Sequence, residues 1–406
     1  MKYLFCTHAN AGSLGPSIAL AKELVRRGHN ICFVSDPSIT SWLGGEGLDY
    51  IPTENHRPTG FNARLWVDPD AVILQCAYIL DAIRSFQPDV MVGHQLTLGP
   101  YIIREITGVP LAVIGLAAWM YPTRSGSGLW LLRDESEWRE REFSARLNEV
   151  RERLSIPTSG KHFEETPIQG DVFLLRSIPA LEGKVEDLPS RVHLIGALIE
   201  PLSTPAMDVI RWLGDCDARN CLYVQEGRTF DCPRFIDLVI ETFKDTNIRV
   251  IVDFANTDGG LPSHWPCNFF AQAGICQSVA LRRCGAVLAT GHSTAVLSAI
   301  CHGVPMLLFP NGSGTTDIAA RCVAAGIASV VADSTLLTSA DLRARVDDVY
   351  SESFREAAVR MQQGFSAYDS EAIAGDLLEE LGCTRMPIVR KSIRSLQSSI
   401  RTPAIA

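Results

Sequence analysis

The fold is decided by one stretch of the sequence, GAVLATGHSTAVLSAICHGVPMLLFP at residues 285–310. A short apolar run at 286–289 is typical of a buried parallel strand, and a turn of small residues follows it. Apolar residues then recur at helical spacing over 295–301, and another apolar run occupies 306–309. Strand, helix and strand in this order form a βαβ unit, so the stretch predicts part of a doubly wound parallel sheet.

The same alternation extends on both sides of this stretch. Before it, strands are predicted at 221–224 and 249–253 and helices at 234–243 and 277–283. After it, a helix is predicted at 317–325. Residues 221–325 therefore have the pattern of one α/β domain.

A separate set of alternating elements opens the chain. It begins with a strand at 3–6, a glycine-rich turn at 8–16, an amphipathic helix at 17–27 and a strand at 30–35. Further apolar runs predict strands at 89–93, 111–115, 172–175 and 193–196. The fold class is thus α/β, with two Rossmann-like doubly wound domains that face each other across a cleft.

The predicted domain boundaries follow from the composition of the chain. An N-terminal domain covers 1–200, the segment PLSTP at 201–205 is a linker, and a C-terminal domain covers 206–375. Residues 376–406 are expected to form a C-terminal helix and a basic tail, since 385–406 hold five basic and no acidic side chains. The simplest interpretation of this tail is a docked helix or a frayed terminus. A helix that binds a membrane surface or a partner is the alternative.

Composition excludes several classes of protein. The chain has 406 residues and a net charge of −9, which disfavours a nucleic-acid partner. No apolar run is long enough to span a membrane, and the N-terminus lacks the pattern of a signal peptide. The twelve cysteines show no metal-binding spacing, so we expect reduced thiols, no metal site and a cytoplasmic location. A homodimer is left open.

Residues 285–310 resemble the donor-binding region of the GT-B glycosyltransferases, specifically the nucleotide-sugar-dependent family that acts on natural products of the antibiotic and macrolide type. The turn AGSLGP at 11–16, the helix end LAKELVRRGH at 20–29 and the block 303–326 resemble the same family. The resemblance implies an inverting, metal-independent sugar transfer from a nucleotide-diphosphate sugar to a small acceptor. The second domain would bind the donor and the first domain the acceptor, without a further cofactor.

The resemblance also implies which residues contact the donor. A turn rich in Gly, Ser and Thr at a helix N-terminus presents N–H groups and hydroxyls to an anion such as a diphosphate, although Ser293 or Thr294 could equally be an ordinary helix cap. The donor candidates are Gly227, Arg228, Thr229, Gln277, Thr290, Gly291, His292, Ser293, Thr294, Ser298, Gly314 and Thr315.

Several of these positions depart from the family pattern. The family's diphosphate-contacting His falls on Thr290, its ribose-binding Glu on Ser298, and its sugar-binding Asp-Gln pair on Gly314 and Thr315. Arg228 could compensate by pairing with a phosphate. These departures suggest an unusual donor, such as a deoxy or furanosyl sugar.

The acceptor side departs as well. The family's catalytic base, a His in the first turn, falls on Ser13, and its partner Asp falls on His94. An imidazole can act as a base near neutral pH, whereas a serine cannot. His94 is therefore the first candidate for a displaced base, with Ser13 as a positioning hydroxyl and His8 as the second candidate. Local hydrogen bonding is the alternative role of both histidines.

Two other functions remain open at this point. The lost motif positions are compatible with a glycosyltransferase-like binding protein without turnover. A nucleotide-sugar epimerase is the third hypothesis, although no convincing pair of acid and base carboxylates is found.

Overall fold

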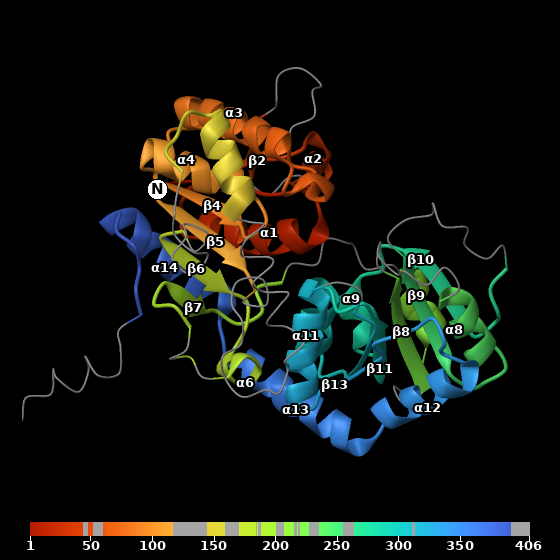
Figure 1. The fold of residues 1–406 in the computed structure, drawn as a ribbon. Helices are drawn as coiled ribbons and strands as arrows, with labels where there is room; N and C mark the ends of the chain where they lie inside the picture. Colours follow the sequence, from red (N-terminus) through yellow and green to blue (C-terminus); the bar gives the residue numbers. More distant parts are fainter. Residues whose placement is uncertain are drawn as a thin grey trace, which may run out of the picture. The chain divides into compact units, whose positions relative to one another are not determined.

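The computed structural model (Figure 1) describes residues 1–43, 48–51, 60–116, 144–158, 170–183, 185, 188–199, 207–214, 217, 220–226, 235–254, 264–310 and 313–390. These residues form two compact units. The first takes in the described parts of Met1–Ser125, Glu137–Leu198 and Asp369–Ala406. The second takes in those of Ile199–Tyr368. The predicted linker at 201–205 lies outside the described residues.

A parallel sheet forms the centre of the first unit. Its strands in spatial order are β3 (Asp49–Tyr50), β2 (Asn30–Val34), β1 (Lys2–Cys6), β4 (Val90–His94), β5 (Leu111–Gly115), β6 (Val172–Leu175) and β7 (Val192–Leu194). β1 pairs in parallel with both β2 and β4, so the chain reverses its direction of winding between β1 and β4. In open α/β sheets, ligands bind beyond the carboxyl ends of the strands at this switch point.

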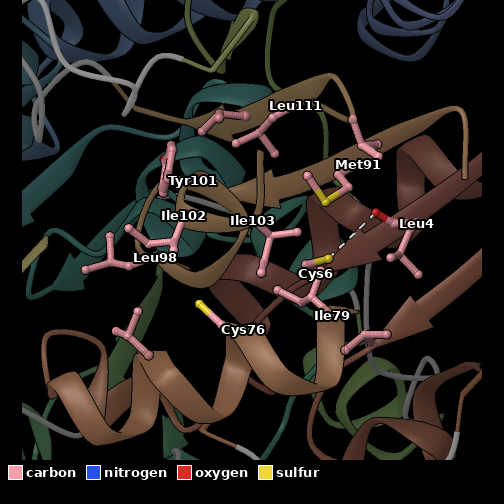
Figure 2. Packing of buried hydrophobic residues seen from close by; sticks show 14 of the residues in the cluster. Leu4, Cys6, Cys76, Ile79, Met91, Leu98, Tyr101, Ile102, Ile103 and Leu111 are labelled. Atoms are coloured by element: carbon pink, nitrogen blue, oxygen red, sulfur yellow. Dashed lines mark hydrogen bonds between the residues drawn. The ribbon is translucent and has the colours of Figure 1, made fainter. Parts of the chain in front are cut away.

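The helices of the first unit cover the sheet. They are α1 (Ala11–Arg26), α2 (Thr40–Leu43), α3 (Pro69–Phe86), α4 (Gly99–Thr107), α6 (Pro179–Glu182) and α14 (Ser370–Thr384), with short 3-10 turns at Pro37–Ile39 and Ala63–Leu65. Residues 144–153 are also helical. Figure 2 shows a single buried cluster that contains Cys76 and Ile79 of α3, Ile102 and Ile103 of α4, and the strand residues Leu4, Met91 and Leu111. This apolar layer holds α3 and α4 against one face of the sheet.

The first turn of the chain corrects the sequence prediction. Residues 11–16 were expected to form a glycine-rich turn, but α1 already begins at Ala11. The Asn10 side chain accepts a hydrogen bond from the N–H of Ser13, which caps the helix. The helix start was missed in the sequence because Gly12, Gly15 and Pro16, residue types that disfavour helices, follow the cap.

The C-terminal residues also differ from the prediction. The predicted boundary at 375/376 falls within α14, which belongs to the first unit, so residues 370–375 were placed in the wrong domain. Arg27 at the end of α1 donates hydrogen bonds to Asp376, Glu379 and the carbonyl of Ala372, which fixes α14 to α1. Residues 386–390 are not helical, and the rest of the basic tail lies outside the described residues.

The second unit has its own parallel sheet. Its strands in spatial order are β10 (Phe269–Ala273), β9 (Arg249–Phe254), β8 (Cys221–Glu226), β11 (Ala286–Ala289), β12 (Met306–Leu308) and β13 (Ala328–Val330). The described helices are α7 (Met207–Leu213), α8 (Phe235–Phe243), α9 (Gln277–Leu281), α10 (Ser293–Cys301), α11 (Ser313–Ala324), α12 (Ser339–Val349) and α13 (Glu352–Ser366). β10 and β13 are edge strands that were not predicted.

Both sheets confirm the predicted α/β fold class. Apolar residues of α8 and α12 pack on the side of the second sheet that carries Leu222 and Val224. Its direction of winding reverses between β8 and β11, in the same strand order as around β1 and β4. Within residues that the structure describes, no helix is long and apolar enough to cross a membrane.

Candidate active site

The donor candidates of the second unit follow strand β11, at the switch point of the sheet. Thr290, Gly291 and His292 connect β11 to α10, whose first residue is Ser293. Gly291 has a φ of +85°, and a Cβ there would lie 3.1 Å from the carbonyl oxygen of Thr315 in α11. The loop therefore passes close to the first turn of α11, and the structure brings Thr290, Gly291 and Thr315 together.

The start of α10 is suited to an anion. His292 is the N-cap residue, but its side chain does not cap the helix, and Ser293 and Thr294 are partly exposed. The first N–H groups of a helix have no partner within the helix, and its dipole places positive potential at this end. The first turn of α11 lies beside Gly291 through the carbonyl of Thr315, so a diphosphate at the start of α10 would lie close to that turn.

Ser298 lies farther along α10 than the first turn. Its side chain is buried, and its carbonyl oxygen is 2.7 Å from Nδ1 of His302, which is the C-cap residue. The contact of Ser298 with a ribose stays a prediction.

Gln277 belongs to a buried polar network that the sequence did not reveal. It forms a side-chain hydrogen bond with the hydroxyl of Tyr223, which in turn donates to the Asp253 carboxylate at 2.6 Å. Asp253 also accepts a hydrogen bond from the N–H of Ile275 at 3.1 Å. Burial raises the pKa of the Asp253 carboxyl, while the bond from Tyr223 opposes that shift. The network fixes the start of α9. In the sequence, the sign of it is Asp253, a charged residue near the end of the apolar run that forms β9.

Gly227, Arg228 and Thr229 lie outside the described residues, so a phosphate contact by Arg228 stays a prediction. Gly314 falls in the first turn of α11, next to Thr315.

The acceptor candidates of the first unit meet at the switch point between β1 and β4. His8 follows β1, and His94 is the last residue of β4. The Nε2 atom of His8 lies 2.9 Å from the carbonyl oxygen of Leu96, and the N–H of Leu96 donates to Nδ1 of His94 at 3.4 Å. Both imidazoles are thus fixed by the backbone of the same residue.

Ser13 lies in the first turn of α1, which starts beyond His8. Its side chain is buried, and its carbonyl oxygen accepts a hydrogen bond from the hydroxyl of Ser17 at 2.8 Å. This placement agrees with a site near the end of β1, while its role as a positioning hydroxyl stays a prediction.

The surroundings of the two histidines make them weak bases. Burial, with smaller contributions from Arg176 and His8, lowers the pKa of His94 to about 3. Burial also lowers the pKa of His8. An effective general base has a pKa near the working pH. His94 is neutral at pH 7 but has little affinity for a proton, so the structure gives the predicted base role poor chemical support.

The same burial predicts an acid-sensitive fold. The unfolded chain takes up protons on His8 and His94 near pH 6.5, whereas the folded chain resists them. Stability is therefore expected to fall as the pH drops below about 6.5, by about 1.4 kcal/mol per pH unit for each imidazole. Urea unfolding between about pH 7.5 and 5.5 measures this slope. His94→Gln should reduce it and His264→Gln, at an exposed site, should not; equal slopes would contradict the explanation.

The described residues contain no group of His, Cys, Asp or Glu side chains arranged to hold a metal ion. The cysteines among them are free thiols, and Cys221 lies 3.2 Å from Cys284 between their sulfur atoms.

Comparison with known proteins agrees with this geometry. Residues 279–364 match the family model described as UDP-glucoronosyl and UDP-glucosyl transferase. The chain is 24% identical to 4'-demethylrebeccamycin synthase of Lentzea aerocolonigenes over an alignment of 424 positions. The alignment covers 94% of this chain and 99% of that protein.

Solved structures with the same fold are also found. The glycotransferase of kitacinnamycin has a TM-score of 0.73 at 20% identity, over 93% of this chain and 98% of that chain. The spinosyn rhamnosyltransferase complexed with thymidine diphosphate has a TM-score of 0.69 at 17% identity, over 93% and 100% of the two chains. The chain thus has the fold of these glycosyltransferase structures over nearly its whole length, and its second unit contains a match to a glycosyltransferase family model.

Proposed function

We propose that the chain transfers a sugar, with inversion, from a nucleotide-diphosphate sugar bound by the second unit to a natural-product-like small molecule bound by the first. The observation that carries the donor half is the uncapped start of α10 directly after Gly291, beside the first turn of α11. The thymidine diphosphate complex of a structural neighbour and the names of the relatives support the substrate classes.

The chemistry proposed is a single displacement. An acceptor atom attacks the anomeric carbon, and the bond from that carbon to the diphosphate oxygen breaks. The diphosphate leaves with the electron pair and is stabilised by the N–H groups at Ser293 and Thr294. The nucleotide sugar is a substrate, and the proposal requires neither a resident cofactor nor a metal ion. A buried serine at position 298 and the Gly314–Thr315 pair favour an unusual donor sugar.

A thermal-shift screen with nucleoside diphosphates and nucleotide sugars tests the donor half. A ligand at 100 times its dissociation constant stabilises the protein by about 2.7 kcal/mol. For domains of this size we expect the melting temperature to rise by roughly 5–10 °C. Transfer is then measured with the donor that gives the largest shift, by mass spectrometry of the products.

The screen also addresses the alternative of a binding protein without turnover, which the low basicity of His94 favours. A thermal shift without any transferred or hydrolysed sugar would support that alternative. No shift across the panel would reject the donor site itself.

A further inference from the structure

Two buried cysteines of the second unit lie side by side at the amino edge of its sheet. Cys221 is the first residue of β8, and Cys284 lies two residues before β11, the neighbouring strand. Their sulfur atoms are 3.2 Å apart, and the two residues are 0% and 4% exposed. Since a disulfide bond is about 2.0 Å long, these sulfur atoms need to approach by only about 1 Å to form one.

This contact differs from those of other buried cysteines, which place their sulfur against a carbonyl or hydroxyl oxygen. Among the described residues these are Cys6, Cys32, Cys76 and Cys276. The contact between Cys221 and Cys284 joins two thiols instead, and they are 63 positions apart in the sequence. Loss of the two thiol hydrogens would therefore link two segments of the sheet covalently.

The two cysteines differ in how the backbone holds them. The carbonyl oxygen of Cys221 accepts hydrogen bonds from the N–H of Gly285 at 2.9 Å and from the hydroxyl of Tyr350 at 2.8 Å. Cys284 belongs to the turn between α9 and β11, where its N–H donates to the carbonyl of Leu281 over a longer 3.3 Å. Cys221 is thus held on a central strand, while the turn can supply the small movement that closes the distance between the sulfur atoms.

We propose that Cys221 and Cys284 are an oxidation site, at which hydrogen peroxide converts the two thiols into a disulfide that links the amino ends of β8 and β11. Arg282 and Arg283, directly before Cys284 in the turn, are exposed, so a small oxidant has a short path to the sulfur when the turn opens. Because both thiols are buried, we expect the bond to form slowly, under sustained oxidation, and then to resist reductants in solution.

The reaction balances in two steps. The sulfur of one cysteine attacks an oxygen of hydrogen peroxide, the O–O bond breaks, and a sulfenic acid and one water are formed. The second sulfur attacks the sulfenic sulfur, the S–O bond breaks, and the oxygen leaves as a second water. The protein loses two hydrogens and two electrons, and one peroxide is reduced to two waters.

The bond would lie at the end of β11 opposite to the donor candidates. Cys284 precedes the 4 residues of this strand, whereas Thr290 and Gly291 follow them. At about 3.3 Å per residue, the strand alone separates the two places by on the order of 13 Å. Oxidation is therefore expected to stabilise the second unit and to leave nucleotide binding unchanged. The inference does not depend on the proposed function.

Peptide mapping of the full chain after treatment with hydrogen peroxide tests for the bond. The remaining thiols are alkylated and the protein is digested with trypsin, which should leave residues 220–228 linked to residues 284–321. The second peptide also contains Cys301, so fragmentation of the linked pair must place the bond at Cys284. Two free thiols after the treatment, or a bond from either cysteine to a different one, would overturn the inference.

Thermal unfolding of the oxidised protein measures the effect of the bond. A disulfide that closes a loop of this length should raise the melting temperature of the second unit by roughly 5–15 °C. Cys221→Ala and Cys284→Ala should each abolish the rise. The matched control is Cys267→Ala with Cys383→Ala, which removes two exposed thiols and should retain the rise. A rise that persists in Cys221→Ala would contradict the assignment, and the peptide map decides on the wild-type chain if a variant does not fold.

Nucleotide binding separates this inference from the proposed function. The oxidised and reduced proteins should bind uridine or thymidine diphosphate with dissociation constants within about twofold of each other. A difference of about tenfold or more would show that the bond acts on the donor site, against the expected separation. If neither form binds a nucleotide, the proposed function fails, while the peptide map still decides on the disulfide.

Discussion

Asp171→Ala is expected to destabilise the first unit by about 3 kcal/mol, because one buried carboxylate serves three donors. Asp171 accepts from Nε of Arg104 at 2.7 Å, from its second guanidinium nitrogen at 2.5 Å and from the N–H of Leu111 at 2.9 Å. Its side chain is 5% exposed, whereas that of Arg104 is 27% exposed. Removing one partner of a buried pair costs about 3–5 kcal/mol, and the partial exposure of Arg104 places the effect near the lower end.

Asp171 also joins distant segments of the unit. Its N–H donates to the carbonyl of Leu111, and its own carbonyl accepts from the N–H of Ile388. The variant is therefore expected to loosen the start of β5 and the residues after α14 together. Urea unfolding followed by circular dichroism measures the loss, and hydrogen exchange at Leu111 locates it.

An exposed pair of the same chemistry provides the control. Arg84 and Asp81 form an ion pair on the surface of α3, where both side chains are largely exposed. Asp81→Ala should change stability by no more than about 0.5 kcal/mol. Similar losses for Asp171→Ala and Asp81→Ala would show that burial of Asp171 contributes little.

Much of the fold could be predicted because buried parallel strands leave a strong local signal. The runs at 3–6, 111–115 and 286–289 are apolar at every position, and each became a central strand. β10 and β13 were missed because they lie at the edges of their sheet, where FFAQA and ASV carry less apolar character. At α1, the cap by Asn10 outweighed the local effect of two glycines and a proline.

The site could be predicted only in part, and for a clear physical reason. The apolar runs of β1, β4 and β11 were predicted, so the sequence placed His8, His94 and the Thr290–Gly291 loop at strand ends, where ligands bind in open α/β sheets. Arg176 and Tyr223 reach these places through pairing between strands distant in sequence. Desolvation of His94 likewise depends on what packs around it, and no spacing in the sequence encodes its low pKa.

Gly291→Ala is expected to weaken nucleoside diphosphate binding by about 100-fold, which is equivalent to about 2.7 kcal/mol. At a φ of +85° an alanine side chain is strained, by about 1–2 kcal/mol. Its Cβ would also lie 3.1 Å from the carbonyl oxygen of Thr315, so the loop or the first turn of α11 must move. Either movement displaces the N–H groups at Ser293 and Thr294 that the proposal assigns to the diphosphate. Isothermal titration with thymidine and uridine diphosphates measures the loss.

Gly326→Ala is the control for backbone strain alone. Gly326 has a φ of +71°, but a Cβ there meets only the Cβ of Ala357, at an ordinary 3.8 Å. The control should lose similar stability through its backbone and retain nucleotide affinity, because Gly326 lies after the C-terminal end of α11, away from the donor loop. Equal affinities in the two variants would place the donor site elsewhere. Selective loss in Gly291→Ala would instead tie nucleotide binding to the contact between this loop and Thr315.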